Sequence, residues 1–93
     1  MSGKSNRALA NGNTFSINIP VNATRVIFAY PSTLRDVTSV KDVNGMNAEI
    51  KSAFTQSTVL VEGANGYTAI SYKVYTTDYG EPNNKANTYT VTI

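Results

Sequence analysis

The sequence contains no cysteine, no histidine and no tryptophan. Without cysteine, a disulfide framework and a thiol nucleophile are both excluded. Without histidine, the chain lacks the side chain that most often exchanges protons near neutral pH, and the two absences together remove the commonest zinc ligands. We therefore expect no metal and no cofactor in this protein.

Charged residues are also scarce, since they make up 15% of the 93 residues and leave a net charge of +2. Typical soluble domains contain about 25%. The Lys and Arg residues are scattered singly along the chain, whereas a nucleic-acid surface needs them clustered. We expect no nucleic-acid partner. Short neutral polar residues are abundant instead, and such a surface does little to oppose association with other proteins.

Long hydrophobic runs are missing as well. No stretch approaches the ~20 apolar residues of a membrane span, so we expect no membrane partner. Residues 1–13 are polar, rich in Gly and Asn, and without the apolar centre of a signal peptide, which predicts a flexible lead-in or linker. Residues 14–93 are predicted to form a single β-domain.

Alternation of apolar and polar residues is clearest in the segment 87–93 (NTYTVTI). Successive side chains on a strand point to opposite faces of the sheet. Tyr89, Val91 and Ile93 therefore share one face, and an apolar residue at the end of a strand is useful only if that strand is paired inside a sheet. We assign this face to the core.

The segment 67–75 (YTAISYKVY) alternates in the same way. We assign three of its residues to the core face and two tyrosines to the opposite face. The core face holds Ile70, Tyr72 and Val74, and the opposite face holds Tyr67 and Tyr75.

Four further strands are predicted, at residues 14–20, 24–30, 57–62 and, more weakly, 36–43. The first has Phe15, Ile17 and Ile19 on its core face, and the second has Val26, Phe28 and Tyr30. The second also carries Ile27 and Ala29 on its other face, which predicts a central strand or one covered on both sides.

Asn44-Gly45 is a strong hairpin signal, because a type I′ turn needs positive φ at both central residues. Residues 46–50 would then pair back onto the preceding strand. The four-residue spacing of Met46, Ile50 and Phe54 leaves open a short helix near residues 47–54. We prefer the hairpin and expect Phe54 to be buried in either case. The complete pattern predicts an all-β fold, an antiparallel β-sandwich (Ig-like or jelly-roll-like) of about seven strands.

Two carboxylates share the long loop at 77–86, namely Asp78 and Glu81. A glycosidase uses two carboxyl groups about 5–10 Å apart, so this pair leaves that activity open. Carboxylates on loops are ordinarily just solvated, and the chain has no histidine to activate a serine. We expect a protein that is not an enzyme.

The chain has six tyrosines, which can stack on sugar rings or fill a protein interface. The alternative is that they lie partly buried under loops. We identify four residues as candidate contacts with a ligand or a partner protein. They are Tyr67, Tyr75, Tyr79 and Asn83.

The segments 61–75 (VEGANGYTAISYKVY) and 87–93 (NTYTVTI) resemble the C-terminal β-domain of structural proteins of tailed bacteriophages and prophages. The resemblance extends over roughly residues 4–93. It implies a virion component without enzymatic activity, from the capsid, neck, tail or fibre, assembled in the cytoplasm of the bacterial host. It also implies other virion proteins as partners and a homo-oligomer. The resemblance transfers no functional residue to this chain.

Two functions follow as expectations. The first is a structural or interaction module of a phage particle that acts through protein–protein assembly. The alternative is a carbohydrate-binding module that recognises a glycan on the host surface through the four candidate contacts.

Overall fold

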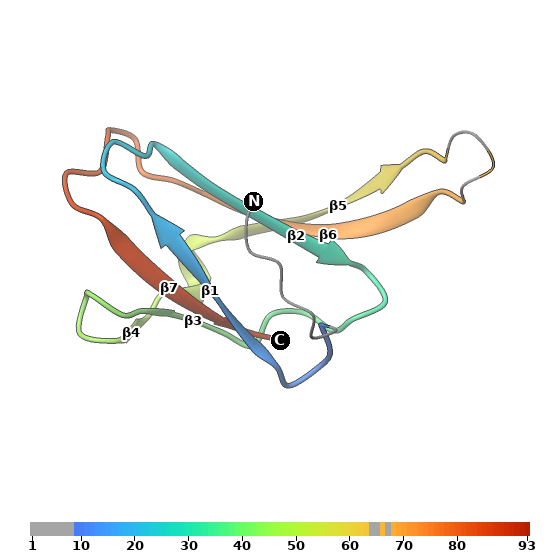
Figure 1. The fold of residues 1–93 in the computed structure, drawn as a ribbon, viewed down its shortest axis with the longest axis horizontal. Helices are drawn as coiled ribbons and strands as arrows, with labels where there is room; N and C mark the ends of the chain where they lie inside the picture. The colour runs from blue at the N-terminus through green and yellow to red at the C-terminus, as the bar shows by residue number, and fades with distance from the viewer. Residues whose placement is uncertain (1–8, 64–65, 67) are drawn as a thin grey trace.

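A computed structural model describes residues 9–63, 66 and 68–93 of the chain (Figure 1). The described residues form seven β-strands and one short 3₁₀ helix. They are β1 (Thr14–Ile19), β2 (Arg25–Pro31), β3 (Ser39–Asp42), β4 (Ala48–Glu49), η1 (Lys51–Ala53), β5 (Thr55–Val61), β6 (Ile70–Asp78) and β7 (Asn87–Thr92).

The strands form two sheets, and every pairing between neighbouring strands is antiparallel. The first sheet has four strands in the order β1-β7-β3-β4, and the second has three in the order β2-β6-β5. Figure 1 shows the two sheets one above the other, and buried apolar residues from both form one core between them. The predicted all-β fold of antiparallel strands is confirmed and is consistent with a β-sandwich.

The last strand lies inside the first sheet, where β7 is paired with β1 on one side and β3 on the other. Tyr89 is buried, and Val91 and Ile93 are completely inaccessible to solvent. The predicted core face of this segment is confirmed. Ile93 follows this strand directly and is held in place as well. Its backbone is hydrogen-bonded to Gly12 and Asn13.

The face assignment in β2 is confirmed, because Val26, Phe28 and Tyr30 are buried and Ile27 is 57% exposed. The prediction of a central or doubly covered strand is wrong for this chain. β2 is an edge of the three-stranded sheet, and its second face is open to solvent. The apolar residues on the second face of β2 therefore form part of the molecular surface.

The face assignment in β6 is wrong. Tyr75 is buried, with 4% of its surface exposed, whereas Ile70 is 47% exposed. The register explains the reversal: Tyr75 lies opposite Phe28 of β2, and directly paired residues share a face of the sheet. Their rings stack with centroids 5.0 Å apart. Alternation separates a strand's residues into two sets, but the neighbouring strand determines which set faces the core.

The hairpin between β3 and β4 forms, but its turn is not centred on Asn44-Gly45 as predicted. The positive φ angles fall at Met46 (61°) and Asn47 (56°) rather than at Asn44-Gly45. Gly45 packs closely against Asp42, since a Cβ there would lie 2.6 Å from Oδ2 of that side chain and would displace it. The alternative helix is present only as the single turn η1.

Two smaller predictions about this region need correction. β3 is shorter than residues 36–43, although Val37 and Val40 are both buried as core residues. Val43 is exposed, because it lies in the turn beyond the strand. Phe54 is only partly buried, at the margin of the core.

Part of the predicted lead-in is attached to the body of the domain. The side chain of Asn11 accepts a hydrogen bond from the backbone N–H of Arg35, at 2.9 Å. Gly12 and Asn13 bond to Ile93. The boundary at residue 14 stays a prediction, and residues 1–8 lie outside the described residues.

Candidate functional site

The structure brings together two of the four predicted contact residues. Tyr79 and Asn83 lie in the loop between β6 and β7 and line the same pocket. Tyr75 does not join them, because it lies in the core, and its assignment to an exposed face is wrong. Tyr67 lies outside the described residues.

The pocket at this loop has a volume of about 370 Å³. Its lining is mostly neutral and polar, with two tyrosines and three asparagines. The lining residues are Tyr79, Glu81, Pro82, Asn83, Asn84, Asn87 and Tyr89. A neighbouring hollow of about 520 Å³ shares Asn87, so this end of the sandwich presents a polar surface rich in asparagine.

The two tyrosines of the pocket are hydrogen-bonded to each other. Their hydroxyl oxygens are 2.7 Å apart, and Tyr89 is buried while Tyr79 is half-buried. Burial raises the pKa of the Tyr89 hydroxyl, and the hydrogen bond to Tyr79 raises it further. Tyr89 therefore stays neutral at physiological pH and serves to position the ring of Tyr79.

The polar groups of Asn83 are used in hydrogen bonds within the fold. Its side-chain amide donates to the carbonyl of Pro20 at 2.9 Å, and its side-chain oxygen accepts from the N–H of Lys85 at 3.2 Å. Its backbone is bonded to Asn22 and Ala23. Asn83 thus fastens the β6–β7 loop to the turn between β1 and β2, which gives the pocket a defined shape.

The two loop carboxylates have separate surroundings. Asp78 ends β6 and forms an ion pair with Arg25 of β2 at 2.6 Å, with both side chains more than half exposed. Glu81 lines the pocket. The engagement of Asp78 with Arg25 gives it a role at the end of a sheet, and an exposed pair of this kind contributes little to stability.

Another carboxylate, Glu49, is held by three donors. It accepts from the Ser39 hydroxyl at 2.6 Å and from the N–H groups of Val40 and Lys51 at 2.8 and 3.1 Å. These bonds favour the ionised form, so they lower the pKa of Glu49, with the Ser39 bond first. The residue fastens β3 to the start of η1.

Within residues 9–63, 66 and 68–93, no group of three or more acidic, histidine or cysteine side chains is placed to hold a metal ion. The same part of the chain contains no helix that is long and apolar enough to span a membrane.

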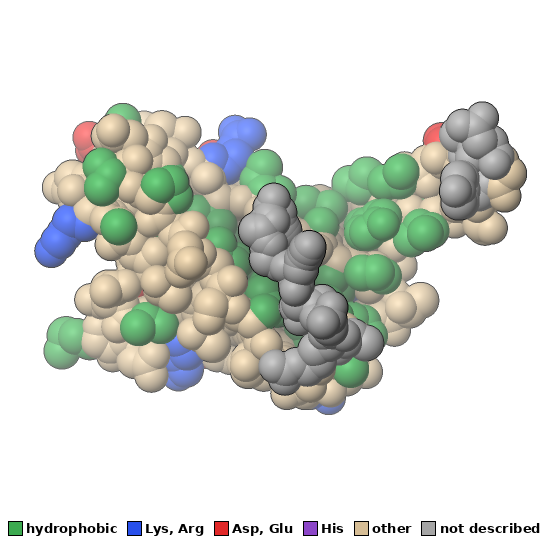
Figure 2. Space-filling view, in the orientation of Figure 1, with side chains coloured by type: hydrophobic (Ala, Val, Ile, Leu, Met, Phe, Trp, Pro, Cys, Tyr) green, Lys and Arg blue, Asp and Glu red, His purple; other side chains and the backbone are tan. Residues whose placement is uncertain are grey.

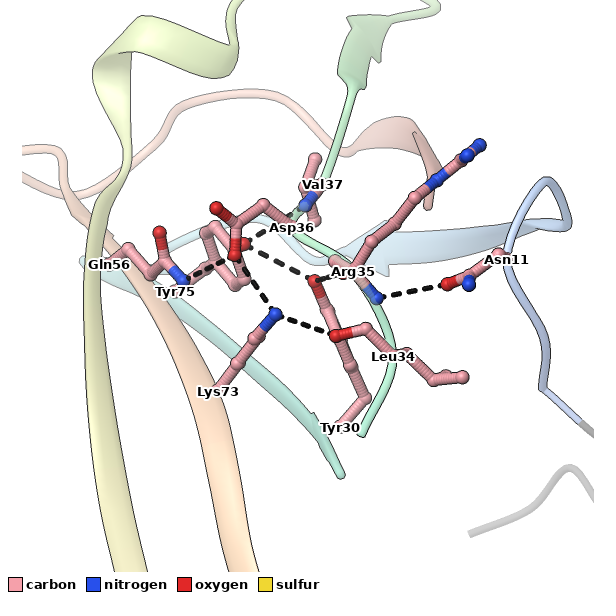
Figure 3. Close-up of polar contacts among 9 residues, drawn as sticks. All are labelled: Asn11, Tyr30, Leu34, Arg35, Asp36, Val37, Gln56, Lys73 and Tyr75. Carbon is pink, nitrogen blue, oxygen red and sulfur yellow. Dashed lines mark hydrogen bonds and ion pairs between the residues drawn. The ribbon is translucent and has the colours of Figure 1, made fainter. Parts of the chain in front are cut away.

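A polar network fixes the segment that crosses from β2 to β3 (Figure 3). The Val37 N–H donates to the Tyr75 hydroxyl at 3.0 Å, and the Tyr30 hydroxyl donates to the Arg35 carbonyl at 2.7 Å. The hydroxyl oxygens of Tyr30 and Tyr75 are 3.2 Å apart. Because the Tyr30 hydrogen is used on Arg35, Tyr75 donates to Tyr30, and each group in the chain of bonds is satisfied.

Lys73 of β6 and Gln56 of β5 extend this network. The Lys73 ammonium donates to the Leu34 carbonyl at 2.6 Å and lies 3.0 Å from the Asp36 carboxylate, which also accepts from Gln56 at 2.9 Å. The bonds from Lys73 and then Gln56 lower the pKa of Asp36. Every described group here has an internal partner, which identifies the network as structural.

The feature that the sequence analysis missed is an exposed apolar surface on the second sheet. Val59, Val61 and Ile70 are each about half exposed, and so is Ile27 on β2. All seven residues of β5 are exposed. Figure 1 shows β5 and β6 continuing together beyond the rest of the sandwich, and Figure 2 shows hydrophobic side chains gathered over this projection.

A signal for this surface was present in the sequence. The apolar residues on both faces of residues 24–30 pointed to a strand with something packed on each side, and Val59, Leu60 and Val61 repeat that pattern on β5. The structure supplies a cover for one face only.

No protein-family model, no curated protein and no solved structure matches the chain.

Proposed function

We propose that the chain is a non-enzymatic structural and interaction module of a tailed-bacteriophage or prophage virion, acting through protein–protein contacts. The observation that carries the proposal is the uncovered apolar surface on β2, β5 and β6. Monomeric proteins rarely expose contiguous apolar patches larger than a few hundred Å², and exposed apolar patches are where another protein can dock.

The character of this surface supports a protein partner. It lies on strands, which are rigid elements, and it continues onto β5, an edge strand with exposed side chains on both faces. The β5 segment TQSTVLV contains no charge and no proline, which are usual means of protecting an edge from pairing. A protein that is meant to assemble has no need of such protection.

The sequence resemblance supplies the setting for the proposal. Its most specific segment, residues 61–75, begins at the end of β5 and continues into β6. Val61 and Ile70 of this segment are exposed members of the projecting surface. Within this proposal, the protein is located in the virion and its partners are other virion proteins.

The experiment is immuno-electron microscopy of intact particles induced from the bacterial strain that carries the gene. Antibody raised against residues 14–93 should label one defined part of each particle, and antibody pre-absorbed with the purified domain should not. Protein that accumulates in the cells while the particles stay unlabelled would contradict the proposal.

A second candidate, recognition of a host glycan, rests on the pocket beside Tyr79 and Asn83. A half-buried tyrosine ring among neutral amides has the chemistry that binds sugars, by stacking and hydrogen bonding. Titration with host cell-wall polysaccharide, followed by NMR, should shift the signals of both residues. The Asn84→Ala variant should weaken the response, and the surface variant Thr33→Ala should not. Absence of shifts in the loop 79–87 would exclude this function.

A further inference from the structure

The apolar surface on the second sheet is one continuous face. Opposite residues of neighbouring strands share a face, so the registers identify its members. We call the surface formed by these residues the outer face. Its apolar members are Ile27, Ala29, Pro31, Val59, Val61, Ile70, Tyr72 and Val74.

The registers place these side chains in rows across the three strands. Pro31 lies opposite Tyr72, which lies opposite Val59. The next row along contains Ala29 and Val74, and Val61 pairs with Ile70 towards the other end. Six of the eight are exposed, Tyr72 and Val74 are half-buried, and no described element lies over them.

The outer face is uncharged over most of its length. Its charged members within the described strands are Arg25 and Asp78, which lie opposite each other at one end and form an ion pair. Nucleic acid, an acidic peptide or a lipid headgroup needs a complementary charge that this face does not offer. An apolar, uncharged protein surface fits it.

We infer that the outer face is covered by the outer face of a second copy of this chain, so that the two sandwiches stack sheet against sheet. A neutral face meets no like-charge repulsion from its own copy. Identical sheets have the same twist, which allows them to stack about 10 Å apart with their strands nearly aligned. This inference rests on the proposed function and names its first partner.

The small size of the face limits the strength of the contact. Three strands of about six residues cover roughly 15 by 20 Å, or about 300 Å² per copy. That is small compared with the roughly 800 Å² per partner of a stable complex. The isolated domain therefore forms a dimer that depends on concentration, and the many copies in a particle strengthen it through high local concentration.

β5 provides a matched pair of test positions. Val61 and Leu60 are neighbours on the same strand and are 52% and 56% exposed. Val61 belongs to the outer face, whereas Leu60 lies opposite Ser71 and points to the other side of the sheet. Lysine at either position adds the same charge to the same strand.

The experiment is sedimentation velocity from about 10 µM to about 1 mM, a range that brackets weak dimers. The wild type should dimerise. Val61→Lys and Ile27→Lys, on opposite edges of the sheet, should each weaken dimerisation by at least about tenfold, as expected for desolvating a charge. Leu60→Lys should leave it unchanged. NMR spectra check that each variant stays folded.

Three outcomes would overturn the inference: a wild type that stays monomeric throughout, a dimer that Val61→Lys leaves intact, or equal weakening by Leu60→Lys, which indicates pairing through the β5 edge. The proposed function fails separately. A monomeric domain that still labels particles overturns only the second copy, and a dimer that leaves particles unlabelled overturns only the virion role.

Discussion

On β2, the two faces of the three-stranded sheet have similar composition and opposite environments. On β2, Phe28 is 9% exposed while its neighbour Ile27 is 57% exposed. Tyr30 is 2% exposed, and Pro31 beside it is open to solvent. Both sets of side chains are apolar, and they alternate along one strand. Apolar character alone therefore does not determine burial, which also requires a second layer to pack against.

The covered face owes its burial to aromatic packing within its own sheet and against β1 of the other sheet. Phe28 is central, with its ring stacked on Tyr75 at 5.0 Å and edge-on to Phe15 of β1 at 5.7 Å. A third ring, from Phe54, lies 5.6 Å away. The outer face has no such partner among the described residues, so it retains its capacity to bind.

The largest expected effect tests this contrast directly. Phe28→Ala should lower the free energy of unfolding by about 3–5 kcal/mol, because it leaves a cavity among three rings. The neighbouring Ile27→Ala should change it by less than about 1 kcal/mol. Urea denaturation at low protein concentration measures both, and similar losses would show that the faces do not differ as described.

The second effect concerns the polar bonds of the covered face. Tyr75→Phe keeps the ring but leaves the buried N–H of Val37 without its partner, which should cost about 1–3 kcal/mol. Amide hydrogen exchange at Val37 should become faster. The control is Tyr72→Phe on the outer face, which should change neither quantity; unaltered exchange at Val37 in the Tyr75 variant would contradict the assignment.

The smallest effect is on acid stability, and it comes from neither face but from the first sheet. The bonds to Glu49 lower its pKa below the ordinary 4.5. The stabilisation is therefore complete above about pH 4.5 and disappears as pH falls through the lowered pKa. Because Glu49 is 43% exposed, the effect is modest.

The Glu49→Gln variant should show a weaker loss of stability between pH 5 and pH 3 than the wild type, in urea titrations at each pH. The loop variant Glu81→Gln serves as the control. A Glu49→Gln variant with the wild-type slope would contradict the role assigned to these bonds.

The strand positions could be predicted from the sequence because alternation is a local property of the chain. This gave β1, β2 and β7 with their buried faces. It also placed Tyr79 and Asn83 close together, since one loop carries both.

The remaining features depend on contacts between distant residues. Tyr75 is buried because its register with β2 puts it opposite Phe28, which lies 47 residues earlier in the chain. β2 is an edge strand because of the order in which strands assemble. The outer face exists because the first sheet covers one side of the second sheet only. The sequence determined which residues alternate, and the tertiary structure decided which alternate set was covered, because burial depends on what packs against a strand.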